Sequence, residues 1–188
     1  VCDNYYGAPA WQVTPMEFAL VESLRPVIPA ELGDQEFRGI FSDANHQSPK
    51  HLSITQRSYV SAITRYKDFA ILEYRIHNND SLPIAGLYVA VACDFRTAPW
   101  NSTDDYDYAG TDSARTRAYV KSASSGETLA LGVRHIYPPG MNGFANCINQ
   151  VTYIADGFTK AEKMKFMDGR LRQTQGSTIG NWHAMASS

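Results

Sequence analysis

Hydrophobic and polar residues alternate along much of the chain, which is the pattern of half-buried β-strands. The alternation is clearest over residues 69–79 (FAILEYRIHNN), where Leu72, Tyr74 and Ile76 fall on one face. The turn NNDSLP separates this segment from 85–95 and predicts an antiparallel hairpin. Further strands are expected at 12–22 (interrupted by Pro15), 36–44, 51–63, 115–121, 128–137 and 150–156.

One helix is expected, at about 160–168. Thr159 is a natural N-cap, Glu162 follows three residues later as a capping box requires, and Gly169 is a natural C-cap. The helix is expected to expose Lys160, Lys163 and Lys165 and to bury Met164 and Met167. The tail 171–188 is polar, and no strand is expected in it.

Together these elements predict an all-β fold, an antiparallel two-sheet sandwich of immunoglobulin-like or jelly-roll-like type with one short helix near the C-terminus. The 188 residues are enough for one sizeable core. Residues 1–34 are expected to be an irregular N-terminal segment that packs on the core or links to it. Residues 35–188 are expected to form a single β-sandwich domain.

Composition narrows the class of protein. Hydrophobic residues make up 44% of the chain and charged residues 19%, which suits a secreted or cell-surface module. The net charge of −2 offers no footprint for nucleic acid, and no apolar run is long enough for a membrane span. Of the three cysteines, Cys93 lies in an apolar run and is expected to be buried. Cys2 and Cys147 lie in polar surroundings and either form a disulfide, in an oxidising compartment, or stay unpaired.

A loop at 94–112 carries the strongest hint of chemistry. It holds one basic residue, Arg96, and five aspartates: Asp94, Asp104, Asp105, Asp107 and Asp112. Crowded carboxylates repel one another, and Ca²⁺ would compensate them. An EF-hand is excluded because Ala109 and Thr116 stand at its fifth and twelfth positions. Two interpretations remain: a different type of calcium site built from these aspartates, or aspartates that form turns and caps without metal.

The same loop holds three aromatic residues, Trp100, Tyr106 and Tyr108. They either form a stacking platform for a polysaccharide or pack over the loop and shield its carboxylates. No nucleophile motif, metal-binding histidine pair or catalytic cysteine context occurs, so no catalytic residue is predicted.

Several spaced segments resemble a β-sandwich accessory module of large secreted bacterial proteins, which accompanies subtilisin-like and other extracellular proteases. The family pattern reads "LYVGxFxDWD…DxxRxAYV". The matching segments, within about 35–185, are YKDFAILEYRIHNNDSLPIAGLYVAVACDF, DSARTRAYV, TLALGVRHI, DGFTKAEKMKFMDG and NWHAMASS.

The resemblance implies a non-catalytic structural or interaction unit of a larger secreted protein or assembly. Asp94-Phe95-Arg96 replaces the family's "DWD", which weakens a metal site there. The chain stops where the family's last strands would begin, so either it is part of a longer protein or another chain supplies them. An open sheet edge would then recruit neighbouring domains or subunits by strand addition. The alternatives are a carbohydrate-binding module and a fragment of a secreted hydrolase.

Overall fold

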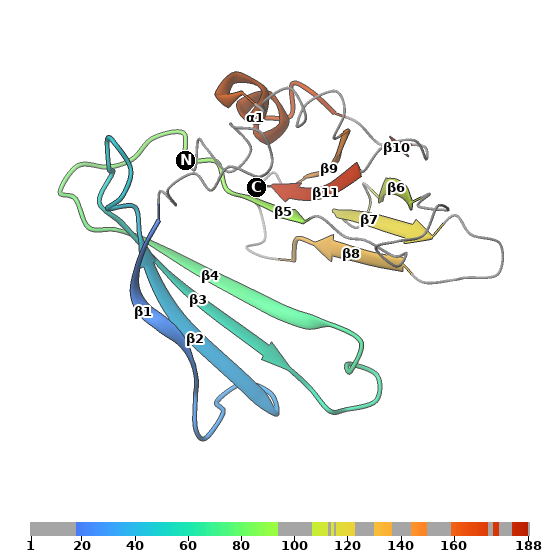
Figure 1. Cartoon of the computed structure of the whole chain (residues 1–188), viewed down its shortest axis with the longest axis horizontal. Coiled ribbons are helices and arrows are strands. Elements are labelled where there is room, and N and C mark those ends of the chain that lie inside the picture. Colours follow the sequence, from blue (N-terminus) through green and yellow to red (C-terminus); the bar gives the residue numbers. More distant parts are fainter. Residues whose placement is uncertain are drawn as a thin grey trace, which may run out of the picture. The chain divides into compact units, whose positions relative to one another are not determined.

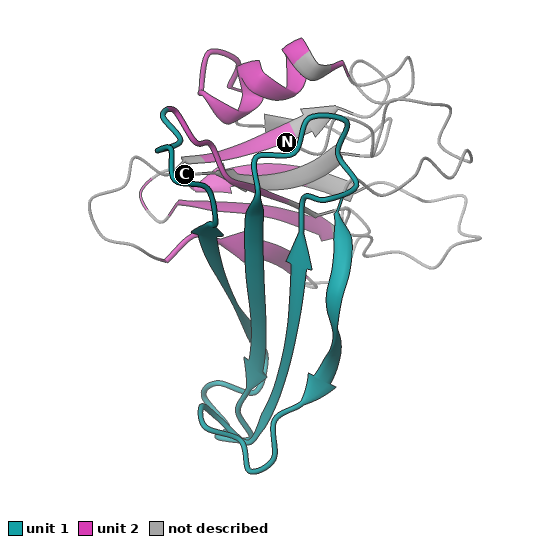
Figure 2. Ribbon diagram, turned by 90° about the vertical axis from the view of Figure 1, so that its left-hand side faces the viewer, with its two compact units in different colours: residues 1–5, 13–85 teal, residues 6–12, 86–188 magenta. Residues whose placement is uncertain are grey.

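A computed structural model of the chain describes residues 18–93, 107–112, 114, 116–122, 130–136, 144–149, 159–172, 175–176 and 182–187. These residues form antiparallel sheets and one short helix, as the alternation predicts (Figure 1). Two compact units divide the chain between Ala85 and Gly86, not at the predicted boundary between residues 34 and 35 (Figure 2). Unit 1 contains residues 18–85, and unit 2 contains the described residues from 86 onward.

Unit 1 is a four-stranded sheet in which consecutive strands are neighbours. Its strands are β1 (Ala19–Pro26), β2 (Gln35–Ser42), β3 (Leu52–Val60) and β4 (Ala70–Asn78). The last three confirm the strands predicted at 36–44, 51–63 and 69–79. Strand β1 overlaps the strand predicted at 12–22 and continues to Pro26, so the prediction of an irregular segment 1–34 does not hold for these residues.

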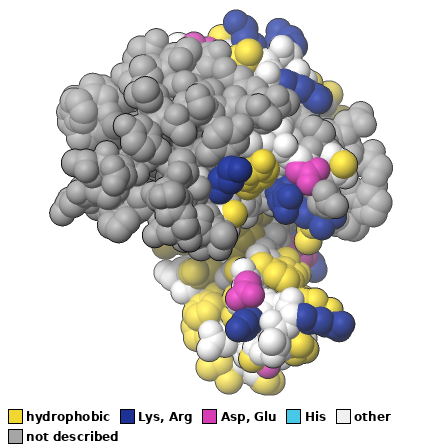
Figure 3. Space-filling view, turned by 90° about the vertical axis from the view of Figure 1, so that its right-hand side faces the viewer, with side chains coloured by type: hydrophobic (Ala, Val, Ile, Leu, Met, Phe, Trp, Pro, Cys, Tyr) yellow, Lys and Arg dark blue, Asp and Glu magenta, His cyan; other side chains and the backbone are white. Residues whose placement is uncertain are grey.

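The register of unit 1 sorts its side chains onto two faces, because residues directly opposite one another share a face. One face, called the apolar face below, gathers Leu20, Phe37, Phe41, Ile54, Val60, Leu72, Tyr74 and Ile76. No hydrophobic residue of the fully described stretch 18–85 is buried. The buried residues there are Glu36, Gly39 and Asp43. Figure 3 shows hydrophobic side chains at the molecular surface beside charged ones.

Unit 2 contains two sheets. One has the order β10-β6-β7-β8 and the other the order β5-β11-β9. Their strands are β5 (Ala90–Cys93), β6 (Asp107–Asp112), β7 (Arg117–Ser122), β8 (Ala130–Arg134), β9 (Phe144–Asn149), β10 (Gln175–Gly176) and β11 (Trp182–Ser187). Strands β7 and β8 confirm the predictions at 115–121 and 128–137. Strand β6 arises where a loop was expected, β9 arises where no strand was expected, and the predicted strand 150–156 lies outside the described residues.

The buried side chains of unit 2 come from strands of both sheets. Ala109 of β6, Val120 of β7 and Cys147 of β9 form one cluster in which every member is fully buried. Ala118 of β7 packs with Ala145 of β9 in a second cluster. Small side chains at these positions allow close approach, and exclusion of water from the clusters stabilises the unit.

Helix α1 (Lys160–Met167) confirms the predicted helix and its capping box. The Thr159 hydroxyl accepts a hydrogen bond from the Glu162 N–H, and the Glu162 carboxylate accepts one from the Thr159 N–H. The predicted faces are right in part: Lys165 is exposed as expected and Met164 and Met167 are half-buried, but Lys163 was expected to be exposed and is buried, as is Phe166. The single aromatic ring at position 166 fixes the orientation of this short helix more strongly than the two methionines.

The predicted hairpin of 69–79 with 85–95 is wrong. Strand β4 ends at Asn78, and β5 pairs with β11 in a different sheet. The Asn78 side-chain amide donates to the Leu82 carbonyl at 2.7 Å, and the Asp80 carboxylate accepts from the Leu82 N–H at 3.3 Å. These side-chain bonds hold a local loop in place of a tight hairpin turn.

The expectation that the polar tail holds no strand is also wrong. Residues 182–187 form β11, which lies between β5 and β9 and pairs with both. The pattern WHAMAS has little β-propensity, but an internal strand gains ladders on two sides, and this context overrides propensity.

Candidate functional site

The structure describes only part of the predicted calcium site. Asp94, Asp104 and Asp105 lie outside the described residues, and only the backbone of Asp107 is described. Asp112 ends β6 directly opposite Arg117 of β7, and its carboxylate Oδ2 lies 3.2 Å from Nη2 of that arginine. The described residues contain no cluster of three or more metal-binding side chains. The calcium site therefore stays a prediction, and Asp112 has a cationic partner.

The predicted aromatic platform is also only partly described. Trp100 and Tyr106 lie outside the described residues. Tyr108 stands in β6 opposite Lys121, and its side chain is not described. The stacking platform therefore stays a prediction.

Cys147 lies at the centre of β9 as a free, fully buried thiol. Burial raises the pKa of this thiol from 9.0 to about 12. Cys2 lies outside the described residues, as does the side chain of Cys93. The pairing of Cys2 with Cys147 stays a prediction, and the surroundings of Cys147 are those of a core residue, not of a polar loop.

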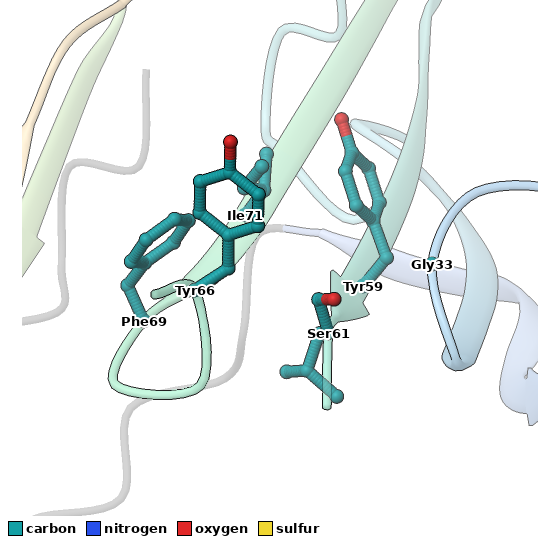
Figure 4. Close-up of a pocket in the computed structure, with 7 residues that line it drawn as sticks. Gly33, Tyr59, Ser61, Tyr66, Phe69 and Ile71 are labelled. Atoms are coloured by element: carbon teal, nitrogen blue, oxygen red, sulfur yellow. The ribbon is translucent and has the colours of Figure 1, made fainter. Parts of the chain in front are cut away.

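Unit 1 contains a shallow aromatic pocket that the sequence did not indicate. Its lining residues come from the end of β3, the start of β4 and two loops: Gly33, Tyr59, Val60, Ser61, Tyr66, Phe69 and Ile71. Figure 4 shows Tyr59 and Tyr66 on either side of the pocket with their hydroxyl groups directed the same way. The Phe69 ring meets the Tyr66 ring edge to face at 5.8 Å between centroids. The Arg65 guanidinium lies over the Tyr66 ring, 4.5 Å from the ring centroid.

A buried ion pair positions one wall of this pocket. The Glu36 carboxylate, on β2, accepts hydrogen bonds from Nε and Nη2 of Arg57, on β3, the former at 2.7 Å. It also accepts hydrogen bonds from the N–H groups of Glu31 and Leu32, both at 3.0 Å. Glu36 thus fixes the loop that contains Gly33 against the end of β3.

The charge state of Glu36 follows from these contacts. Burial alone would raise the pKa of its carboxyl group, but the Arg57 guanidinium and the two backbone N–H groups outweigh burial. The net result is a pKa below the ordinary value of 4.5. Glu36 is therefore ionised at neutral pH and serves as the anchor of the loop.

The loop itself needs a glycine at position 33, where φ is +95°. A β-carbon on Gly33 would lie 2.7 Å from the Val60 carbonyl oxygen. The next residue, Asp34, accepts hydrogen bonds from the Ala62 N–H at 2.6 Å and the Ser61 hydroxyl at 3.2 Å. Gly33 and Asp34 together hold the loop after β3 in place.

Sequence reasoning missed this arrangement. The signals it could have used are the opposite charges of Glu36 and Arg57 on neighbouring predicted strands and the turn pair Gly33-Asp34. The register that brings them together is set by the whole sheet and cannot be read from either segment alone. As a site, the region combines two half-buried tyrosine rings and the exposed Phe69 ring with a hydrogen-bonded frame, a lining of the kind that holds small ligands.

A search of protein-family models, of curated proteins and of solved structures finds no match to this chain.

Proposed function

We propose that the chain is a non-catalytic interaction module of a secreted or cell-surface protein, and that unit 1 supplies the surface that docks a protein partner. The observation that carries this proposal is the apolar face. Leu20 is 60% exposed there, Leu72 49%, Tyr74 40% and Phe37 39%. Burying apolar surface gains about 25 cal/mol per Å², and contiguous apolar patches typically mark interaction sites.

The chemistry of this surface favours a protein over other partners. Polar Gln56 and Ser58 lie among the apolar residues of the same face, as in the mixed surfaces of protein–protein interfaces. The net charge of −2 gives no general attraction to polyanions. The two edge strands of the sheet add backbone groups that suit a partner with an extended segment.

Unit 2 would be the carrier of this surface. We infer that its sheets form a two-layer β-sandwich, which is supported by the buried clusters that join β6 and β7 to β9. No helix in the described residues is long and apolar enough to cross a membrane. A compact carrier and an open second sheet are the parts that an interaction module of a larger assembly needs.

Face-specific photo-crosslinking tests the docking proposal. Benzoylphenylalanine replaces Leu72 on the apolar face or Arg38 on the opposite face, and the chain is produced in its native host. One defined crosslinked species is expected from position 72 and none from position 38. Equal diffuse labelling from both positions, or none from position 72, would overturn the proposal.

We also propose that Ca²⁺ binds and stabilises the module, which is supported by the five aspartates at 94–112. Thermal unfolding of the full chain in Ca²⁺, in Mg²⁺ and after chelation tests it. Selective stabilisation by Ca²⁺ is expected, since a ligand that binds only the folded state raises the midpoint. Identical midpoints in all three conditions would remove calcium from the description.

Carbohydrate binding is a second candidate, favoured by the aromatic pocket of Tyr59, Tyr66 and Phe69. Stacking of such rings on a sugar would leave the hydroxyl groups of the two tyrosines for hydrogen bonds. A glycan array with the native chain, the Tyr66→Ala variant and the Trp100→Ala variant separates the pocket from the predicted platform. Silence of the native chain across plant, algal and bacterial polysaccharides would exclude this candidate.

A further inference from the structure

The two edges of the unit 1 sheet differ in how well they are protected. Strand β1 has register shifts between Leu20 and Glu22 and between Glu22 and Arg25, and it ends at Pro26. Strand β4 is nine residues long, contains no proline, and pairs with β3 without a register shift. Bulges and prolines discourage the addition of another strand, and a long regular edge favours it.

The backbone N–H and C=O groups of successive β4 residues point alternately toward β3 and away from it. The Asn79 N–H donates to the His51 carbonyl of the neighbouring segment at 2.9 Å. In an antiparallel ladder the direction of these bonds alternates from residue to residue. The odd-numbered residues of β4 therefore point their N–H and C=O groups toward β3, and Leu72 and Ile76 point theirs toward the edge that pairs with no described strand.

We propose that two copies of this chain pair antiparallel through β4, with residue 74 opposite residue 74 on a twofold axis. This proposal rests on unit 1 being the docking surface and names a second copy as its partner. In this register Leu72 lies opposite Ile76 of the second copy, and Glu73 lies opposite Arg75 of the second copy. A twofold axis repeats each contact, so one strand sequence supplies both halves of the interface.

Charge complementarity selects this register among those the edge allows. Sliding one strand along the other by two residues places Glu73 opposite Glu73 in one direction and Arg75 opposite Arg75 in the other. Like charges directly opposite each other destabilise a strand pair, and opposite charges stabilise it. The Arg75 Nε lies 2.5 Å from the Glu73 Oε1 within the strand, so the pair already stands on one face in the right order. In the dimer the two pairs form a group of four alternating charges.

The other face gains from the same contact. Leu72, Tyr74 and Ile76 all lie on the apolar face, and pairing places them beside their counterparts. Leu72 and Tyr74 are 49% and 40% exposed in the single chain. The apolar face would then run without a break across the β-strands of both copies, whose charged residues 73 and 75 stay on the opposite face.

Charge reversal with rescue tests the pairing. Sedimentation velocity of the full chain across a micromolar concentration series is expected to show a monomer–dimer equilibrium. Glu73→Arg or Arg75→Glu alone places like charges opposite each other twice per dimer and is expected to weaken dimerisation roughly tenfold or more. The double variant restores opposite charges with reversed sign and is expected to dimerise like the native chain.

Mixing the two single variants gives a sharper readout. Glu73→Arg has arginine at positions 73 and 75, and Arg75→Glu has glutamate at both. A heterodimer of the two variants is therefore expected, although neither forms a homodimer. Arg38→Glu changes the net charge as Arg75→Glu does but lies on β2, away from the edge, and is expected to leave dimerisation unchanged. Circular dichroism checks that each variant is folded.

Three results would overturn the β4 pairing: a native chain that stays monomeric throughout, single variants that dimerise as well as the native chain, or a mixture without heterodimer. A monomeric chain that still gives a defined crosslink to another protein from position 72 would sink the pairing and leave the docking function intact.

Discussion

Unit 2 buries hydrophobic side chains while its two described ion pairs, Asp112–Arg117 and Asp168–Arg170, stay partly exposed. Unit 1 buries the Glu36–Arg57 pair and leaves its hydrophobic side chains exposed or half-buried. In unit 2, Val120 and Phe166 are fully buried, and the Asp112–Arg117 pair is 19% and 45% exposed. In unit 1 the Glu36 side chain is 0% exposed and that of Arg57 14%. Both units are antiparallel, so strand content alone does not determine what holds a sheet together.

The difference accompanies the number of sheets in each unit. A sheet needs a second layer to bury its apolar face, and unit 2 contains two sheets and a helix. Unit 1 is one sheet, and its order depends on backbone ladders and on carboxylates that fix its loops: Asp34, Glu36 and Asp43. This arrangement stabilises the sheet although much of its apolar face stays exposed.

The largest effect is expected for the Cys147 thiol, whose reactivity should differ between the folded and the denatured chain. Raising the thiol pKa from 9.0 to about 12 lowers the thiolate fraction roughly a thousandfold. In a variant with Cys2 and Cys93 replaced by alanine, maleimide labelling of the folded chain is expected to be slower than in denaturant by at least that factor. Fast labelling of the folded chain would show that the core of unit 2 opens readily.

Core truncation in unit 2 is expected to cost far more than truncation on the apolar face. Phe166→Ala removes a fully buried ring and is expected to lower the free energy of unfolding by about 3–5 kcal/mol. Leu72→Ala, at a position that is 49% exposed, is expected to change it by less than about 0.5 kcal/mol. Chemical denaturation followed by hydrogen exchange assigns each loss to its unit.

A large loss for Leu72→Ala in monomeric protein would show that the apolar face is already covered within the chain. Unit 1 would then bury hydrophobic side chains as unit 2 does.

The alternation of the sequence was sufficient to locate β2, β3 and β4, and the capping residues Thr159 and Glu162 were sufficient to predict the helix. It could not supply the layer that each strand packs against, because one alternating pattern suits both a covered and an open sheet. Strand β11 was missed because Ala184, Met185 and Ala186 gain stability from two neighbouring strands that lie far away in the sequence. The Glu36–Arg57 pair was missed for the same reason, since strand register is a property of the whole sheet.

Removal of the buried charge in unit 1 is expected to lower its melting temperature by about 5 °C or more, since Arg57 is left without its buried partner. Glu36→Gln makes this change, and Glu31→Gln is the matched control because the Glu31 side chain is 68% exposed. The control is expected to shift the midpoint little. Equal shifts in both variants would contradict the role of Glu36 as the buried anchor.

The same carboxylate predicts a pH dependence. Its pKa is lower in the folded chain than the ordinary 4.5, so below that value the unfolded chain binds more protons. The stability it contributes is complete above pH 4.5 and is lost as the pH falls through the folded-state pKa. As the pH falls over this range, the melting temperature of native unit 1 is expected to fall more steeply than that of the Glu36→Gln variant. Parallel curves would assign the acid sensitivity elsewhere.

Glycine substitutions separate backbone strain from steric contact. Gly33 and Gly86 both have positive φ, +95° and +67°, but only a β-carbon at Gly33 would meet a backbone oxygen. Gly86→Ala is expected to cost about 1 kcal/mol from strain alone, and Gly33→Ala about 2–3 kcal/mol because the loop must also move. Urea denaturation measures both. Similar costs at the two positions would mean that the Gly33 loop is not held against β3.

The smallest effect is expected for the Asp112–Arg117 ion pair of unit 2. Asp112→Asn removes one charge from a half-exposed pair and is expected to cost about 0.5 kcal/mol, less at high salt because ions screen surface charges. Thermal unfolding in low and high salt, with and without Ca²⁺, measures this cost. A loss several times larger that appears only in Ca²⁺ would make Asp112 a metal ligand. A small, salt-sensitive loss that is equal in both conditions leaves Asp112 as the partner of Arg117 and confines the predicted calcium site to the other aspartates.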